Sequence, residues 1–500
     1  MATLIPAAEP QRVRHEVDVT RDGRIPTAEH GVTLSGDLYR PQSMDPVPVL
    51  VTTIPYRKDI TSVLSAAPFH WFAERGYACL LVDLRGTGSS DGRPRPKFDP
   101  AEGDDAIAAI DWAAAQPWCT GSVGMWGISY GGVMALRAAT LRPAQLKAII
   151  AIECPLDPGR DAFHHDGARV DLHQRALWSG SMLVQQLLPS LADHTARAQQ
   201  RRWRERPHDT EPFITDLARG PDDPVWRERV IDPIEIAAPT LCVGGWRDLY
   251  ADAMVGLYER LTVPKKLLIG PWMHSMPQDS PFEPIDFLPI AVRWWDHWLS
   301  DVDTGVMEEP PVVLYTQGDR PGWRAHGSWP KANAELELAT QDDTRLAAPA
   351  LTSTGSGGAI AEYEPDATTG ALSGLWGVPN PDFGLPLDQH DDDVRALPFT
   401  SDPLADDLLV CGRPTVTVTL ARGDTSSRNG VQRIVVRLAD VDPCGGSTFI
   451  TAGVLCPDGP PMCIASSCGR PATGSAPGTG CASCSAIPIF RASRRCRGPA

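Results

Sequence analysis

This 500-residue chain has no long apolar run and no excess of positive charge. None of its hydrophobic stretches is long enough to cross a bilayer. Residues 1–16 contain proline and arginine but no apolar signal-peptide core. Its 46 lysines and arginines are outnumbered by 62 aspartates and glutamates, and the net charge of -16 disfavours binding to nucleic acid or anionic membranes. We therefore expect a cytoplasmic protein with neither nucleic acid nor membrane as a partner.

Metal-binding patterns are also missing. His164, His165, Asp166 and His173 are near one another in the sequence, but they lack the His-x-x-x-His and His-Glu-x-x-His spacings of metal-binding helices. A zinc site built from cysteines needs two closely spaced pairs, and only Cys481-x-x-Cys484 has that spacing. We predict no metal ion and no cofactor.

The residues around Ser129 form the most informative motif. An apolar run at 122–128 leads into Gly127-Ile128-Ser129-Tyr130-Gly131, and residues 133–139 are typical of a helix. Gly-x-Ser-x-Gly between a strand and a helix is the pattern of a nucleophile elbow, a tight turn that exposes a serine hydroxyl. Small residues are needed on both sides of the serine because the turn is crowded. We predict that Ser129 is a catalytic nucleophile.

A serine nucleophile needs a histidine to take its proton and a carboxylate to orient that histidine. In α/β-hydrolases the acid and then the histidine follow the serine along the chain, each after a strand. The apolar run 239–245 precedes Asp248, and the run 265–270 precedes His274, so both are in the required order. Asp252 remains a competitor for the acid role, and Asp248 could instead cap the helix expected at 249–261.

The oxyanion of the reaction needs two hydrogen-bond donors. One should be the backbone N–H of Tyr130, the residue after the nucleophile. The other should come from the loop after the strand predicted at 47–54, which reads Pro55-Tyr56-Arg57-Lys58 and contains no His-Gly-Gly motif. The hydroxyl of Tyr56 is the candidate donor, although a tyrosine at a strand end can also serve packing alone.

Taken together, these motifs resemble one family of serine hydrolases. It contains bacterial cocaine esterase, glutaryl acylase-type esterases, α-amino-acid ester hydrolases and the X-prolyl dipeptidyl peptidases. The resemblance covers roughly residues 20–455, and in the family the tyrosine of the Pro-Tyr pair serves the oxyanion hole, which implies that role for Tyr56. The matching segments are residues 31–41, 55–58, 83–92, 127–132, 245–248 and 270–275.

The alternation of strands and helices predicts an α/β class, and the resemblance implies an α/β-hydrolase with a helical cap and a C-terminal β jelly roll. We expect the hydrolase domain at 20–155 and 236–305, with the cap inserted at 156–235. The jelly roll is expected at 310–455, where short alternating strands are separated by turns.

The last segment, residues 456–500, does not fit this organisation. It holds half of the 12 cysteines and many alanines, prolines, glycines and arginines, and it shows no strand pattern. We interpret it as the product of a frameshift near residue 455 in a GC-rich gene, which would leave the jelly roll incomplete, with unpaired strand edges.

We expect hydrolysis of carboxylic esters, or of amides, through an acyl-enzyme; the substrate would be a small ester, an amide or a short peptide. An aromatic pocket could be formed by Trp126, Trp178, Tyr250 and Trp272. The first alternative is an X-prolyl dipeptidyl aminopeptidase, for which Asp161, Asp166 or Asp171 would bind the free amino group. The second alternative is an inactive protein that binds a carbohydrate or partner through the jelly roll.

Overall fold

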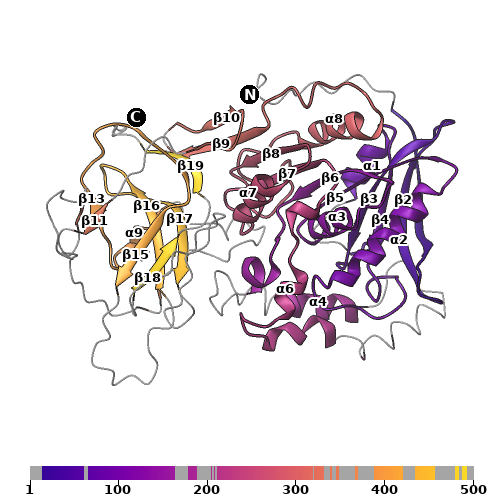
Figure 1. Ribbon diagram of the computed structural model, residues 1–500, viewed down its shortest axis with the longest axis horizontal. Coiled ribbons are helices and arrows are strands. Elements are labelled where there is room, and N and C mark those ends of the chain that lie inside the picture. Colours follow the sequence, from indigo (N-terminus) through magenta and orange to yellow (C-terminus); the bar gives the residue numbers. More distant parts are fainter. Residues whose placement is uncertain are drawn as a thin grey trace. The chain divides into compact units, whose positions relative to one another are not determined.

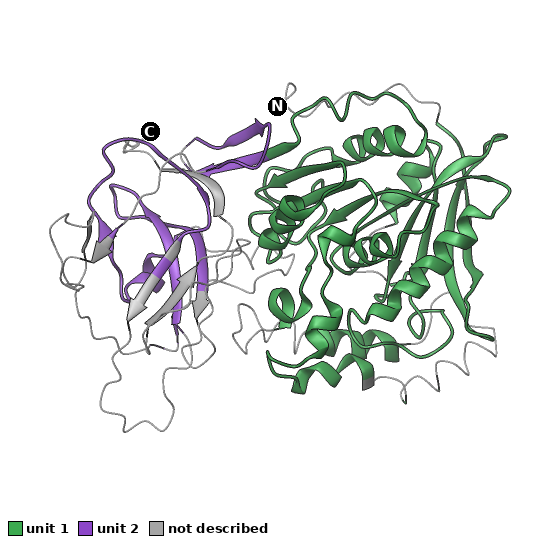
Figure 2. Cartoon of the chain, viewed as in Figure 1, with its two compact units in different colours: residues 1–313 green, residues 314–500 purple. Residues whose placement is uncertain are grey.

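The computed structural model divides the chain into two compact units, Met1–Val313 and Leu314–Ala500 (Figure 2). In the first unit it describes residues 14–60, 66–163, 178–188 and 211–313, with the single positions 204 and 208. In the second it describes residues 314–318, 320–331, 338–340, 345–347, 366, 368–369, 388–419, 434–455, 479–483 and 487–492.

A mixed β-sheet forms the centre of the first unit (Figure 1). Its strand order is β1-β2-β4-β3-β5-β6-β7-β8, in which β1, β2 and β4 pair antiparallel and the strands from β4 through β8 are parallel. The central strands are nearly continuous apolar runs, as expected of a parallel sheet covered on both faces. The strands are β1 (Val17–Pro26), β2 (Thr33–Pro41), β3 (Val47–Ile54), β4 (Ala78–Asp83), β5 (Cys119–Ile128), β6 (Leu146–Ile152), β7 (Thr240–Gly245) and β8 (Lys265–Gly270).

Helices pack on this sheet and create the core. On one face, Trp295 of α8 (Phe287–Leu299) lies against Gly124 of β5, where a Cβ would come within 2.9 Å of the indole. On the same face, α1 (Ala67–Ala73) supplies Phe69 and Phe72 to the ring of Trp126. The other helices of the α/β layers are α2 (Gly103–Ala114), which follows a short 3-10 turn η1 (Pro100–Glu102), α3 (Tyr130–Leu141) and α7 (Ala251–Arg260).

Between β6 and β7 the described residues form short helices, in agreement with the helical content expected of the cap. They include α4 (Ser179–Leu187), α6 (Val225–Arg229) and the turns η2 (Gly159–Phe163), η6 (Glu211–Phe213), η7 (Thr215–Ala218) and η8 (Pro233–Glu235). His164, His165, Asp166, Asp171 and His173 lie outside the described residues.

The second unit is rich in β-structure. Antiparallel pairing joins β16 to β17, and Ile450 of β17 forms a small core with Leu404, Val410 and Leu438. The described elements are β9 (Val312–Gly318), which starts at the boundary of the two units, β10 (Gly322–His326), β11 (Ala339–Thr340), β12 (Arg345–Ala347), α9 (His390–Asp393), β13 (Thr400–Ser401), β14 (Leu408–Gly412), β15 (Thr415–Thr419), β16 (Ile434–Val441) and β17 (Ser447–Leu455).

The expectation that no strand follows residue 455 is wrong. Two strands form there, β18 (Thr479–Ser483) and β19 (Ile487–Ala492). β18 pairs antiparallel with β15, and β19 pairs antiparallel with β14 and parallel with β9. Strand edges leave backbone N–H and C=O groups without partners, and the backbone of this cysteine-rich segment supplies such partners.

Candidate active site

Ser129 occupies the turn between β5 and α3. Its backbone has φ 57° and ψ −119°, a conformation rare for residues other than glycine and typical of strained turns at active sites. The turn closes so tightly that a Cβ at Gly127 would lie 2.6 Å from the carbonyl carbon of Gly131. The N–H of Ser129 donates to the carbonyl oxygen of Ile152 at 2.9 Å, which fixes the turn to β6. These features are those of a nucleophile elbow.

Asp248 and His274 follow β7 and β8 and meet at the same edge of the sheet. The Nδ1 atom of His274 lies 2.6 Å from Oδ2 of Asp248, and the Asp248 carboxylate is buried. Its other oxygen accepts the N–H of Tyr250 at 2.7 Å, which holds the carboxylate in place. A carboxylate that accepts from Nδ1–H leaves Nε2 free to take a proton from a serine. Of the two acids that the sequence left open, Asp248 is the one that contacts His274.

Tyr56 lies just after β3, and its side chain is almost fully buried. Its hydroxyl accepts a hydrogen bond from the indole N–H of Trp178 at 3.2 Å. Burial raises the pKa of the Tyr56 hydroxyl, and hydrogen bonds with Trp178 and Ser129 partly oppose that rise. The hydroxyl therefore remains protonated beside the nucleophile, where it can donate to an oxyanion.

Tyr130 is the first residue of α3, so its backbone N–H has no acceptor within the helix. Its side chain serves another purpose: the hydroxyl hydrogen-bonds to both carboxylate oxygens of Glu102, at 2.7 and 2.8 Å. The Tyr130 ring stacks on Trp178 with 6.3 Å between ring centroids and contacts Tyr56 edge-on at 5.9 Å. Three aromatic rings thus fix one another around the two predicted oxyanion donors.

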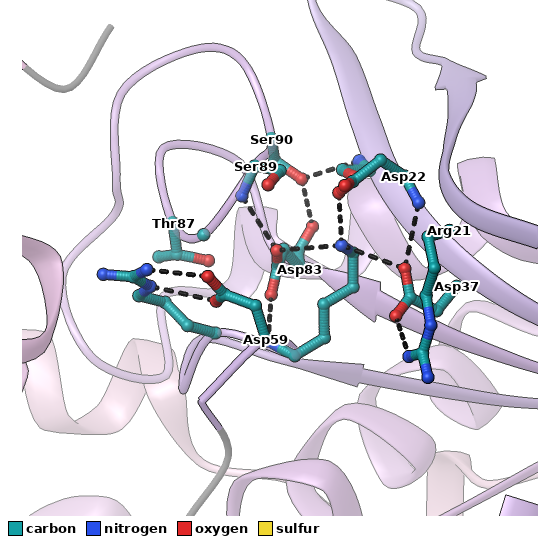
Figure 3. Close-up of polar contacts among 12 residues, drawn as sticks. Arg21, Asp22, Asp37, Asp59, Asp83, Thr87, Ser89 and Ser90 are labelled. Carbon is teal, nitrogen blue, oxygen red and sulfur yellow. Dashed lines mark hydrogen bonds and ion pairs between the residues drawn. The ribbon is translucent and has the colours of Figure 1, made fainter. Parts of the chain in front are cut away.

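Ion pairs on two sides hold the loop that follows β3 (Figure 3). Arg57 has φ 63°, pairs with the carboxylate of Asp59, and donates to the carbonyl oxygens of Gln185 and Leu188 at the end of α4. From the same helix, the Gln186 side chain donates to the carbonyl oxygen of Pro55 at 3.1 Å. The loop that carries Tyr56 is therefore bound directly to the cap.

On the other side, the ammonium group of Lys58 is buried among three carboxylates. Its Nζ atom lies 2.5 Å from Asp22, 3.0 Å from Asp37 and 4.0 Å from Asp83. Burial lowers the pKa of Lys58, but these charges outweigh it and raise the pKa overall. Burial also raises the pKa of Asp83, to about 6, against the opposing effect of Lys58. The cluster connects the loop to the β1–β2 hairpin and to the loop after β4, as Figure 3 shows.

The four aromatic residues predicted for the pocket occupy different places. Trp178 contacts Tyr56 and Tyr130, and the ring of Tyr250 lies edge-on to His274 with 5.6 Å between centroids. Trp126, by contrast, is buried against Phe69 and Phe72 in the core. Trp272 is also fully buried, and its indole N–H donates to the carbonyl oxygen of Glu283 at 3.1 Å. Trp178 and Tyr250 are thus the two that lie at the candidate site.

Sequence reasoning missed Glu153, which follows β6 between the strands of the serine and the acid. Its side chain is fully buried, and Oε2 lies 3.6 Å from Nδ1 of His274. Glu153, Asp248 and His274 each place one ligand-type atom within 4.8 Å of the others. The 2.6 Å separation of His274 Nδ1 and Asp248 Oδ2 is a hydrogen-bond distance. It is too short for two ligand atoms of a tetrahedral zinc ion, which lie about 3.3 Å apart. The available signal was a lone acid directly after a predicted strand.

Residues 30–276 match the X-Pro dipeptidyl-peptidase (S15 family) model, and residues 304–458 match the X-Pro dipeptidyl-peptidase C-terminal non-catalytic domain. The chain belongs to the S15 family. It is a serine hydrolase of that family, with a mixed α/β-hydrolase sheet followed by a β-rich C-terminal domain, as the sequence predicted.

Relatives of this S15 hydrolase include proteins with different activities in their names. It is 29% identical over 476 residues to the cocaine esterase of a Rhodococcus species, covering 85% of this chain and 81% of the esterase. A solved CocE/NonD family hydrolase from Staphylococcus aureus has the same fold, with a TM-score of 0.73, 17% identity and coverage of 96% and 84% of the two chains. An aminopeptidase from a marine sediment archaeon, Thaumarchaeota archaeon, also shares it, with a TM-score of 0.71, 18% identity and coverage of 97% and 89%.

Among the described residues of the S15 hydrolase, no helix combines the length and the apolar character needed to span a membrane.

Proposed function

We propose that this S15 hydrolase cleaves carboxylic esters through an acyl-enzyme formed on Ser129. The observation that carries the proposal is the buried 2.6 Å contact between His274 and Asp248, at the same sheet edge as the strained turn of Ser129. Each of these residues follows a strand of one parallel array, in the order of an α/β-hydrolase triad. The set needs no cofactor.

In the first step Ser129 Oγ forms a bond to the ester carbonyl carbon while Nε2 of His274 takes its proton. The carbonyl electrons move to the oxygen, and the hydroxyl of Tyr56 with the backbone N–H of Tyr130 stabilises the oxyanion. Collapse of this intermediate breaks the bond to the leaving alcohol, which receives the proton from His274. Water then repeats the sequence on the acyl-enzyme and releases the carboxylic acid.

The contacts of Asp161 favour an ester over an X-prolyl peptide. A dipeptidyl peptidase must bind a free amino terminus, and Asp161 was one of three predicted carboxylates for that role. Its Oδ2 atom instead accepts the backbone N–H groups of Leu156 and Asp157, each at 2.9 Å, and the residue is half-buried. Asp161 is thus engaged in the structure of its own turn. The other two, Asp166 and Asp171, lie outside the described residues.

The experiment that tests the proposal is labelling with a fluorophosphonate, followed by intact mass and peptide mapping. We expect one adduct per chain on Ser129, none on Ser129→Ala, and hydrolysis of p-nitrophenyl acetate by the unmodified enzyme only. Ser129→Ala should lose activity on the order of 10⁶-fold. Ser181→Ala is a matched control, because that exposed hydroxyl only donates to the carbonyl oxygen of Trp178.

Three results would change the assignment. Undiminished activity of Ser129→Ala would refute the nucleophile. Cleavage of X-Pro amides with no cleavage of esters would replace the esterase by the peptidase. Absence of any adduct on the folded protein would favour the binding protein that the sequence left as an alternative.

A further inference from the structure

A second buried carboxylate lies beside the predicted acid of the triad. Glu153 follows β6, Asp248 follows β7, and the two strands are neighbours in the sheet. The N–H of Glu153 donates to the carbonyl oxygen of Val243 at 2.9 Å, so its backbone is held against the strand that leads to Asp248. Glu153 has φ 43°, a left-handed conformation that costs a residue with a side chain about 1–3 kcal/mol. The sheet edge imposes this conformation where Glu153 turns toward His274.

The Oε2 atom of Glu153 contacts the segment that carries His274. It accepts the backbone N–H of Ser275 at 3.0 Å and lies 3.6 Å from Nδ1 of His274. The Oε1 atom is buried and has no hydrogen-bond partner in the described part of the chain. Gly245 makes room for it, because a Cβ at that position would lie 2.7 Å from Oε1. A buried carboxyl oxygen without a partner is costly, so its retention calls for an explanation.

We propose that Glu153 is a reserve acid of the triad: it positions His274 by holding the backbone of Ser275, and it orients the imidazole itself when Asp248 is lost. This inference rests on the proposed function, in which His274 is the general base. Glu153 is a positioning residue, because it acts on the reaction only through His274.

The charge state of the pair follows from its surroundings. Burial raises the pKa of Glu153 well above its usual range, the charge of Asp248 raises it further, and the N–H of Ser275 opposes the rise. The thiol of the adjacent Cys154 is neutral, because burial raises its pKa as well. These effects favour the protonated form of Glu153 beside Asp248. Removal of Asp248 removes the repulsion, so the pKa of Glu153 falls and its carboxylate becomes available.

The geometry permits the exchange of roles with a small movement. A hydrogen bond from Nδ1–H to a carboxylate needs about 2.8 Å, so Oε2 of Glu153 must approach by less than about 1 Å. His274 would then keep the same tautomer, with Nε2 facing Ser129. The reaction itself is unchanged.

The test is a double-mutant cycle with Asp248→Ala and Glu153→Gln, measured as kcat/KM for p-nitrophenyl acetate and as the rate of fluorophosphonate labelling. The amide of Glu153→Gln can still accept from Ser275 but cannot ionise, so we expect a loss of less than about tenfold. Asp248→Ala should lose about 10²-fold, and its activity should rise with pH as Glu153 ionises. The double variant should lose about 10⁴-fold, as when a triad has no acid, and should lack that rise.

Glu102→Gln is the matched control, because Glu102 is equally buried but its carboxylate contacts Tyr130 instead of His274. In the double variant of Glu102→Gln and Asp248→Ala, we expect the activity losses of the two single variants to multiply. The rise of activity with pH seen in Asp248→Ala should remain. Should Asp248→Ala fail to fold, Asp248→Asn replaces it at the same volume. Circular dichroism verifies that each variant is folded.

Equal activity of Asp248→Ala and the double variant would overturn the proposal, as would losses that simply multiply. Failure of the proposed function looks different: the unmodified enzyme would then show no Ser129 adduct and no ester hydrolysis.

Discussion

The guanidinium of Arg57 donates a hydrogen bond to the carbonyl oxygen of Leu188 at 2.6 Å. Arg57 is the residue after Tyr56, and Leu188 directly follows α4 in the cap, so this bond connects the predicted oxyanion donor to the cap. Arg57 is fully buried and also carries the bond to Gln185 and the ion pair with Asp59. The position of Tyr56 therefore depends on the cap.

Arg57→Met should loosen the loop of Tyr56 and reduce catalysis. We expect kcat to fall by about 10–100-fold, because oxyanion donors act only when they are correctly placed. Ester kinetics over a range of substrate concentrations separate kcat from KM. Arg142→Met is a suitable control, because that arginine also donates to a backbone carbonyl, that of Glu235, at an exposed site. A control loss as large as that of Arg57→Met would contradict the interpretation.

Tyr56→Phe removes the hydroxyl and keeps the ring. We expect kcat to fall by about 10²–10³-fold with little change in KM, since the hydroxyl stabilises the transition state and not the bound substrate. Fluorophosphonate labelling should slow in parallel, because the phosphonyl oxygen needs the same donor. Trp178→Phe tests the indole N–H that supports Tyr56, and its loss should be smaller. Full activity of Tyr56→Phe would show that the second hydrogen-bond donor to the oxyanion is a group other than the Tyr56 hydroxyl.

Lys58→Met leaves the carboxylates of Asp22, Asp37 and Asp83, of which Asp37 and Asp83 are buried, without their shared cation. Breaking a buried ion pair by removing one partner costs about 3–5 kcal/mol, and we expect the free energy of unfolding at pH 7 to fall by that amount. The deficit should shrink as the pH falls below about 6, because protonation of Asp83 removes its uncompensated charge. Urea unfolding at pH 5 and pH 7 measures both effects. An equal deficit at the two pH values would show that lost packing, and not charge, is responsible.

Asp161→Asn should stabilise the protein at neutral pH. Burial raises the pKa of Asp161 from 3.8 to about 6, so the folded state holds a proton that the unfolded state releases. Stability then falls as the pH rises from about 4 to about 6, by about 3 kcal/mol at 1.36 kcal/mol for each pH unit. Asparagine keeps an oxygen for the N–H groups of Leu156 and Asp157. Because its amide does not ionise, the variant should not lose stability over this pH range.

Urea unfolding of Asp161→Asn and the unmodified protein at pH 4 and pH 7 measures this difference. The exposed Asp223, whose pKa is lowered chiefly by the N–H of Val225, titrates below this range. Asp223→Asn should therefore show no change between the two pH values. A constant difference between Asp161→Asn and the unmodified protein would disprove the assignment.

The sequence predicted the elements whose signal is local. Strands β3 and β8 have the expected bounds, because each is an apolar run that ends at a turn residue. The order of Ser129, Asp248 and His274 followed from such runs, and the α/β-hydrolase fold is confirmed. The roles of these residues stay predictions until they are measured.

What could not be predicted depends on contacts between distant residues. Lys58 meets Asp22 across 36 residues, and Glu153 meets His274 across 121, and neither pair has a spacing that marks it. Nothing in the sequence distinguishes Trp178 from Trp272. Trp178 stacks on Tyr130 at the candidate site, whereas Trp272 lies in the core and donates to Glu283. β19 was missed because its segment is surrounded by residues typical of loops.

Strands β18 and β19 join their neighbours through main-chain hydrogen bonds, and such bonds do not depend on which side chains the strand carries. Insertion or deletion of a nucleotide in the codons near residue 455 replaces every downstream side chain but leaves a polypeptide backbone. β19 lies between β9 and β14, and β18 pairs with β15, so these strands can pair with a segment whose side chains differ. The pairing of β18 and β19 therefore depends less on side-chain identity than the strained turn at Ser129 does.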